Sequence, residues 1–452
     1  MKNQNQEGRK NLSGKEKFGY LCSGVSYTFC MIIPAFLIYY ATESLALSIG
    51  AVSGMMALVK VLDGITDLIA GIIIDKTKSK YGKARPWFLR AAIPYGICMA
   101  LLFSIPSGLS TNTKIILLAV LYALVVSVFG TLIGVARYAI VPRMTSEPKI
   151  RGQLGVLGDG IGVVVSNVGM AITLVAAAKI GWKGIFTIYG IIALVFALLC
   201  FALTKEHADE VDQEIENHPA NRMGIKDFFV AIFKNKYALL LFVIVFLQQM
   251  AGGVNMAGGT YYFQYVVGDI TYFSHMAIYN MAFSLVGMFV ATIVARKIGP
   301  KKMFLLGGIA GCICYVIMGI LNGTHVEILL PVIALSSLFG MVFMVTNFAA
   351  FAAAAIDYGQ AKNGIRLEGI TSSVLNIGIK LGTAFATIVF GAIAAAGGYQ
   401  EGGVEQTAAA VQALGKAFVG IPLVTTLAAT IIVLVFYRID KDMAKLGLKE
   451  EA

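Results

Sequence analysis

The stretch VLDGITDLIAGIIID, Val61–Asp75, is apolar enough to lie within a membrane-spanning helix, yet two aspartates stand inside it. Asp63 and Asp67 are four residues apart, and Lys60 precedes the stretch. Each ionisable side chain near the centre of a spanning helix costs about 2.5–3.5 kcal/mol on insertion scales. Positions three and four residues apart share one helical face, so we expect these three side chains to form a polar stripe turned away from lipid. The opposite face is apolar and comprises Leu62, Ile65, Ile69 and Ile72.

The whole chain has the composition of a membrane protein. Its 452 residues are 58% hydrophobic and 13% charged, whereas a soluble domain carries about 25% charged residues. We therefore expect an all-α polytopic membrane protein with twelve transmembrane helices, each formed by a largely apolar window of about 20 residues or more. The windows are 18–41, 49–75, 87–107, 113–141, 153–178, 183–203, 237–267, 274–295, 303–321, 328–356, 368–396 and 411–437.

The basic residues indicate topology and not nucleic-acid binding, although the net charge is +11. Lys and Arg gather at both ends of the chain, in the middle loop and in the even-numbered loops, while the odd-numbered loops are nearly bare apart from Lys114, Lys179 and Lys183. The positive-inside rule then places both termini in the cytoplasm and the chain in the inner (cytoplasmic) cell membrane as a multi-pass protein.

The sequence offers no catalytic constellation. The four histidines lie in loops or at span ends, and neither a phosphate-binding glycine–lysine loop nor a metal-ligand spacing is present. The six cysteines fall in or beside apolar spans, which indicates small core residues and no disulfide framework. We expect a protein that is not an enzyme and that binds no cofactor.

One polar segment divides the chain into halves. The stretch 204–226 is too charged to insert into a bilayer, so we expect a six-helix bundle at 1–203, a cytoplasmic linker at 204–226 and a second six-helix bundle at 227–452. A short basic turn follows the second span in the first half, and a similar turn follows the eighth span in the second half. Paired repeats of this kind are the organisation of major facilitator transporters, whose substrates bind near the bilayer midplane between the halves.

Two interpretations of the polar stripe are open. The first is a buried ion pair of Lys60 with Asp63 that fixes one helix against another. The second is a cation site, because Asp63, Asp67 and the Thr66 hydroxyl form a hard, all-oxygen ligand set. The negative charge would then be neutralised only when a cation or proton is bound, which couples cation binding to transport.

Further polar residues lie inside or at the ends of later spans. Arg137 and Tyr138 end the fourth span, where the guanidinium either extends to the cytoplasmic interface or belongs to a site. Asp159 can pair with Arg137 or Lys380, or contact a substrate. Lys380 has no acidic neighbour in its own helix, and Asn376 lies one turn before it on the same face. The seventh span carries aromatic-belt or substrate-stacking residues: Tyr261, Tyr262, Gln264 and Tyr265.

Several motifs together resemble one family over nearly the whole chain. They are DGITD at 63–67, DKTKSKYGKARPW after it, VPRMTSEPKIRGQL after the fourth span, YYFQYVVGD in the seventh, and IDYGQAKNGIRLEG before IKLGTAFA in the eleventh. In these motifs the chain resembles the glycoside–pentoside–hexuronide:cation symporters, the melibiose permease group of the major facilitator superfamily.

The resemblance implies a sodium, lithium or proton site. Asp63, Thr66 and Asp67 match the family's cation ligands on the second helix, Thr131 matches its threonine on the fourth, and Lys380 matches the lysine near that site. Thr66 stands where an amide is common in the family.

The sugar-binding positions differ from those of the melibiose transporters. Tyr27 and Gly134 stand where that group has carboxylates, Asp159 replaces an arginine, and Tyr138 replaces a stacking tryptophan. A galactoside is therefore not the expected substrate, and another glycoside, a pentoside or a related small solute is favoured.

We thus hypothesise cation-coupled symport of a sugar-like solute by alternating access. The expected substrate-binding residues are Tyr27, Arg137, Tyr138, Asp159, Asn376 and Lys380, with Lys60 and Lys380 in coupling. The expected partners are a small solute and membrane lipid, with no nucleic acid and no obligate protein partner. A proton-coupled exporter, or a carrier of lipid or another small solute with the same fold, is the alternative.

Overall fold

The computed structural model describes residues 12–206, 235–363 and 368–445, which hold helices and loops and no strand. They form two compact units: unit 1 holds 12–206 and the short segment 401–404, and unit 2 holds the other described residues from 235 onward. Most of the expected linker 204–226 lies outside the described residues. The two units are treated separately below.

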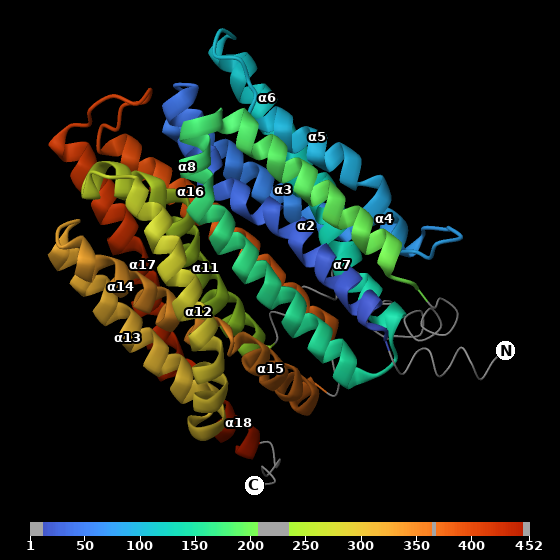
Figure 1. Cartoon of the computed structure of the whole chain (residues 1–452). Helices are drawn as coiled ribbons and strands as arrows, with labels where there is room; N and C mark the ends of the chain where they lie inside the picture. Colours follow the sequence, from blue (N-terminus) through green and yellow to red (C-terminus); the bar gives the residue numbers. More distant parts are fainter. Residues whose placement is uncertain (1–11, 207–234, 364–367, 446–452) are drawn as a thin grey trace. The chain divides into compact units, whose positions relative to one another are not determined.

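Unit 1 is a bundle whose helices run side by side in Figure 1. Helix α2 packs on α8, α3 packs on α7, and α5 packs on α8. Its elements are α2 (Gly14–Tyr39), the π-helical η1 (Tyr40–Ser44), α3 (Ile49–Asp75), α4 (Arg85–Arg90), α5 (Ala92–Leu102), α6 (Thr111–Ala123), the π-helical η2 (Leu124–Gly130), α7 (Thr131–Met144) and α8 (Pro148–Leu203).

Unit 2 is a second helical bundle. Helix α11 packs against both α16 and α17, and α17 also packs on α13. Its elements are α11 (Lys236–Tyr261), the π-helical η4 (Tyr262–Val267), α12 (Thr271–Ile298), α13 (Pro300–Leu321), α14 (Val326–Ser337), the π-helical η5 (Leu338–Phe343), α15 (Phe348–Asn363), α16 (Glu368–Ala396), α17 (Ala408–Phe436) and α18 (Ile439–Lys445).

Each of the twelve windows predicted from the sequence is mainly helical, but short stretches such as 103–107 of the third window and 346–347 of the tenth are not. Among the described residues, nine helices are both long and apolar enough to cross a membrane, and α3 with its central charges is not one of the nine. Helix α8 counts once in that number, but it consists of two arms that meet at Gly181. The arms correspond to the fifth and sixth predicted windows.

Local sequence explains several helix boundaries. Ser13 and Glu16 form a capping box at the start of α2, and the Thr407 hydroxyl caps α17. Gly181 has φ 74° and ψ 163°, a conformation that side-chain-bearing residues rarely adopt, and it separates the two arms of α8. Trp182 then packs against Tyr40 and Phe103 in an aromatic cluster.

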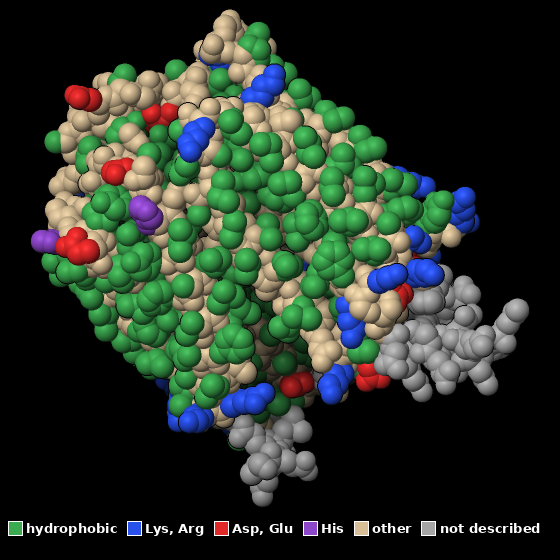
Figure 2. Space-filling view, in the orientation of Figure 1, with side chains coloured by type: hydrophobic (Ala, Val, Ile, Leu, Met, Phe, Trp, Pro, Cys, Tyr) green, Lys and Arg blue, Asp and Glu red, His purple; other side chains and the backbone are tan. Residues whose placement is uncertain are grey.

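The surface fits a bilayer environment. Figure 2 shows hydrophobic side chains along the helices and most charged side chains near helix ends. On α3 the residues predicted to form the apolar face, Leu62, Ile65, Ile69 and Ile72, are all exposed, whereas Asp63 on the opposite face is buried. The sequence-derived orientation of this helix is therefore correct.

Candidate functional site

The centre of the candidate site is a hydrogen bond between α3 and α7. The Thr131 hydroxyl donates to Asp63 Oδ1 at 2.8 Å, and both residues are buried, with Asp63 only 7% exposed. On the neighbouring turn the Ser127 hydroxyl donates to the Val59 carbonyl at 3.2 Å. These two contacts hold the polar stripe of α3 against the fourth predicted span.

The π-helical segment η2 sets the direction in which Thr131 points. A π segment adds a residue to the helical turn and so rotates all that follows it relative to a regular α-helix. The Thr131 hydroxyl also approaches the Val126 carbonyl, five residues back, at 3.1 Å. Gly130 gives the room for this turn, because a Cβ there would lie 2.8 Å from the sulfur of Cys30.

The other predicted cation ligands lie on the same face of α3. Asp67 is half-buried one turn after Asp63, and Lys60 is half-buried nearly one turn before it. Thr66 is half-buried as well, and its hydroxyl donates to the Asp63 main-chain carbonyl at 3.1 Å. The structure thus brings Asp63, Asp67 and Thr131 to one side of α3.

Tyr27 covers the cation-site residues from α2. Its hydroxyl lies within electrostatic range of Asp63 and Asp67, and also of Tyr138. Its ring rests on Gly134, where an added Cβ would lie only 2.6 Å from Tyr27 Cε2. At the two positions where the melibiose group has carboxylates, this chain therefore has the Tyr27 ring and a glycine, Gly134, that leaves room for this ring.

A second polar group surrounds Arg137 on α7. The guanidinium donates to Asp159 on α8 at 2.8 Å, and Arg137 is only 4% exposed, so it does not extend to an interface. The interfacial position considered for Arg137 is therefore wrong, and its role in a site stays a prediction. It lies over the rings of Tyr20 and Tyr138, at 5.9 and 5.1 Å from their centroids.

This group leaves polar and aromatic surface available. The Arg137 Nε is buried without a hydrogen-bond partner. The Asp159 side chain is 61% exposed, and Tyr138 is 59% exposed beside it. An exposed carboxylate and an exposed aromatic ring can together bind a hydroxylated ring through hydrogen bonds and stacking, while the buried guanidinium holds the carboxylate in place.

Two predicted residues belong to unit 2. Asn376 and Lys380 are one turn apart on α16, with Asn376 exposed and Lys380 half-buried. The Thr383 hydroxyl donates to the main-chain carbonyl of Lys380 at 3.0 Å. Their predicted roles in substrate binding and coupling stay predictions.

Sequence reasoning missed two tyrosines of unit 1. Tyr20 lies beneath the Arg137 guanidinium, and Tyr122 is fully buried within electrostatic range of Asp63, with a hydroxyl that has no hydrogen-bond partner. Tyr20 is seven residues before Tyr27, two helical turns on one face, which is a signal that the pattern contained. Nothing local to Tyr122 indicates its neighbours.

The described residues contain no cluster of three or more His, Cys, Asp or Glu side chains fit to hold a metal ion. None of the six cysteines forms a disulfide, and five of them are buried. The predicted cation site at Asp63, Thr66, Asp67 and Thr131 stays a prediction.

Two bundles of long apolar helices are the architecture of major facilitator transporters. A family model described as MFS/sugar transport protein matches residues 19–441. The chain belongs to this family, which confirms the resemblance found in its motifs, and it is a transporter and not an enzyme.

Two relatives match over most of their length. The isoprimeverose transporter of Lactiplantibacillus pentosus is 26% identical over 95% of this chain and 90% of that protein. The putative glycoside/cation symporter YagG of Escherichia coli K12 is 24% identical over 91% of this chain and 89% of that protein. The crystal structure of a D-xylose–proton symporter shares the fold with a TM-score of 0.67 at 14% identity, over 93% of this chain and 96% of that one.

Proposed function

We propose that the chain is a cation-coupled symporter that carries a sugar or glycoside-like solute by alternating access. Na⁺ or H⁺ would be the coupling cation, with Li⁺ as a substitute, bound at Asp63, Asp67, Thr66 and Thr131. Its place would be the inner (cytoplasmic) membrane, with twelve spans and cytoplasmic termini. The positions of the basic residues and the mainly helical character of all twelve windows support this topology.

The hydrogen bond from Thr131 to the buried Asp63 carries the proposal. Carboxylates one turn apart, about 6 Å from each other, repel by about 3 kcal/mol at an effective dielectric constant of about 20. A bound cation removes this repulsion. If that energy is realised in the solute-binding conformation, cation binding raises solute affinity by up to about a hundredfold, and the effect is reciprocal.

The polar group around Arg137 favours a neutral solute. Asp159 already compensates the Arg137 charge at 2.8 Å, so unit 1 offers an anionic hexuronide no uncompensated cation at this place. Tyr138 offers an exposed ring on which the apolar face of a sugar can stack. With an aromatic ring and a glycine in place of carboxylates at 27 and 134, we propose a neutral glycoside or pentoside and not a galactoside. The names of the two relatives above support a sugar or glycoside as the solute.

Uptake by reconstituted protein tests the proposal. Proteoliposomes are screened with neutral glycosides, pentosides, a galactoside and a hexuronide, with and without a sodium or proton gradient. We expect a gradient to stimulate uptake of a neutral glycoside or pentoside. Asp67→Asn is expected to lower that stimulation roughly tenfold or more, because it removes one of the paired charges.

Solute exchange without a gradient is the control for folding. Asp67→Asn should retain exchange of labelled for unlabelled solute, and Glu327→Gln, at an exposed acid of unit 2, should retain both activities. If Asp67→Asn still shows full gradient stimulation, the cation site is wrong. If only an outward-directed sodium or proton gradient drives solute uptake into the proteoliposomes, the chain is an exporter.

A further inference from the structure

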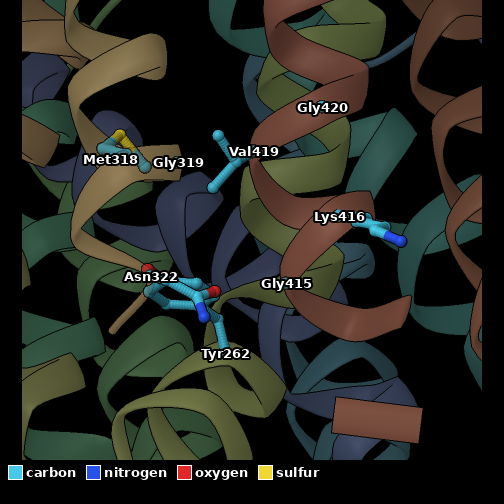
Figure 3. Close-up of a pocket in the computed structure, with 8 residues that line it drawn as sticks. All are labelled: Tyr262, Met318, Gly319, Asn322, Gly415, Lys416, Val419 and Gly420. Atoms are coloured by element: carbon cyan, nitrogen blue, oxygen red, sulfur yellow. The ribbon is translucent and has the colours of Figure 1, made fainter. Parts of the chain in front are cut away.

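We propose that a groove between α13 and α17 of unit 2 binds the upper part of one phospholipid with an anionic headgroup. The groove is a pocket of about 220 Å³ whose lining is mostly apolar (Figure 3). A space of this size suits a segment of an acyl chain. The lining residues are Tyr262, Met318, Gly319, Asn322, Gly415, Lys416, Val419 and Gly420.

Glycines leave this space open. A Cβ at Gly420 would meet nothing within 4 Å, and a Cβ at Gly319 would meet only Val419, at 3.7 Å. On the outer faces of the same helices Val316, Ile320 and Val424 are exposed. In a protein whose apolar helix surfaces face a bilayer, a groove continuous with such residues is next to lipid chains and not next to water.

The pocket is polar at one end and apolar at the other. Asn322 ends α13, and Figure 3 draws it together with Tyr262, whereas Met318 and Val419 lie deeper along the helices. A phospholipid has the same order, with ester and glycerol groups above its chains. The polar end of the pocket therefore fits the ester region, and the glycine-lined part fits the first methylenes.

Tyr262 provides a hydrogen-bond donor at the polar end. The residue is 1% exposed, and its hydroxyl lies near the Gly323 backbone without forming a hydrogen bond of normal geometry. A buried hydroxyl without a partner costs about 1–3 kcal/mol. Because the hydroxyl is buried, a lipid ester carbonyl can accept this hydrogen bond only after the tyrosine side chain shifts toward the pocket.

Lys416 selects the headgroup. Its stem lines the pocket, its ammonium projects outward in Figure 3, and the residue is exposed. Side chains on a helix lean toward its N-terminus, which for α17 is the end nearest Asn322, so the ammonium extends toward the membrane interface. Contact with a lipid phosphate there favours a headgroup whose net charge is negative.

Native mass spectrometry on delipidated, full-length protein in detergent tests this proposal. The probes are phosphatidylglycerol, phosphatidylcholine and water-soluble glycerol phosphate. We expect one phosphatidylglycerol to bind about fivefold more tightly than phosphatidylcholine, the effect of one lysine near an anionic surface. Lys416→Gln should abolish this preference, and Gly420→Leu, at a position where an added Cβ meets nothing within 4 Å, should weaken binding of both lipids.

Lys183→Gln is the matched control, because Lys183 is an exposed lysine of α8 in the other unit. It should leave the preference unchanged. The proposal is overturned if Lys183→Gln and Lys416→Gln lower phosphatidylglycerol binding equally, which would indicate a general surface effect. It is also overturned if Gly420→Leu binds both lipids like the wild type, or if glycerol phosphate displaces phosphatidylglycerol.

Discussion

Asp63 illustrates what a single buried carboxylate requires in a helix surrounded by lipid. A charged group removed from water is stable only with hydrogen bonds or opposite charge around it. Thr131 supplies a short hydrogen bond from the neighbouring helix, and the main-chain contact of Ser127 keeps the two helices in register. A hydroxyl can serve an ion as a ligand equally well, so Thr131 suits both the empty and the loaded site.

Thr131→Val tests this residue directly. Valine keeps the shape but removes the oxygen, and a hydrogen bond to a charged group is worth about 1.5–3 kcal/mol. We expect the cation concentration for half-maximal uptake to rise roughly tenfold or more. Thr131→Ser should restore most of the affinity, since serine keeps the hydroxyl.

The control for Thr131 is a threonine that bonds only within its own helix. Thr292 on α12 is exposed and donates to the Met288 carbonyl at 2.8 Å, so Thr292→Val should leave cation activation unchanged. An unchanged activation constant in Thr131→Val would remove Thr131 from the site.

Some contacts between single residues could be predicted from the sequence, and others could not. Helical spacing predicted correctly that Asp63 faces inward, and Arg137 was one of the partners considered for Asp159. The contact of Tyr27 with Gly134 joins α2 to α7 over more than a hundred residues. No local pattern encodes such a contact, because it depends on how the helices pack.

At the scale of the element, η2 shows why the prediction of a regular helix does not fix the direction of every side chain on it. The window 113–141 was correctly expected to be helical, but a uniform 3.6-residue period cannot fix the direction of Thr131 beyond a π-helical segment. The resemblance to a family assigned Thr131 to the site without giving its orientation. Only the packed bundle supplies that orientation.

The loop between α3 and α4 is another element whose conformation depends on a distant residue. The Glu206 carboxylate, just after α8, accepts hydrogen bonds from the main-chain N–H groups of Lys83, at 2.9 Å, and Arg85. The Arg85 side chain returns the contact by donating to the Phe201 carbonyl at 2.7 Å. One acid therefore holds the end of a basic loop on unit 1.

We expect Glu206→Ala to loosen this loop. Loss of charge-assisted hydrogen bonds worth about 1.5–3 kcal/mol should speed amide exchange across residues 81–85 roughly tenfold. Hydrogen–deuterium exchange of peptides from this loop measures the change. Lys205→Ala, at the exposed neighbouring position, is the control, and equal exchange in both variants would contradict the role of Glu206.

At the scale of the whole molecule, the two units divide the chain near its middle, but the division is not purely sequential. Residues 401–404 lie between α16 and α17 and yet belong to unit 1. There the Glu401 carboxylate accepts from the Ile49 N–H at 2.9 Å, and the Gly402 N–H donates to the Thr42 carbonyl at 3.0 Å. Hydropathy predicted the helices, but it carries no information on where a polar loop docks.

Topology is the property of the whole chain that the charge pattern predicts and that labelling can test. Lys183 begins the sixth predicted span, directly after the short fifth loop, and Lys80 lies in the basic turn after the second span; both residues are exposed. Among the native cysteines five are buried, which keeps background labelling low. With cytoplasmic termini and twelve spans, Lys183→Cys must face outward and Lys80→Cys inward.

A membrane-impermeant maleimide distinguishes the two sides. On cells whose outer barriers have been removed, we expect it to label Lys183→Cys at once and to label Lys80→Cys only after the membrane is permeabilised. The unsubstituted chain measures labelling of its own cysteines, Cys312 above all, because it is only half-buried. Reversed labelling would place the basic turns outside, against the positive-inside rule. Labelling of both variants on the same side would mean that the chain crosses the membrane an even number of times between Lys80 and Lys183, and not three times. Either result would replace the proposed topology, while the hydrogen bond from Thr131 to Asp63 would stand.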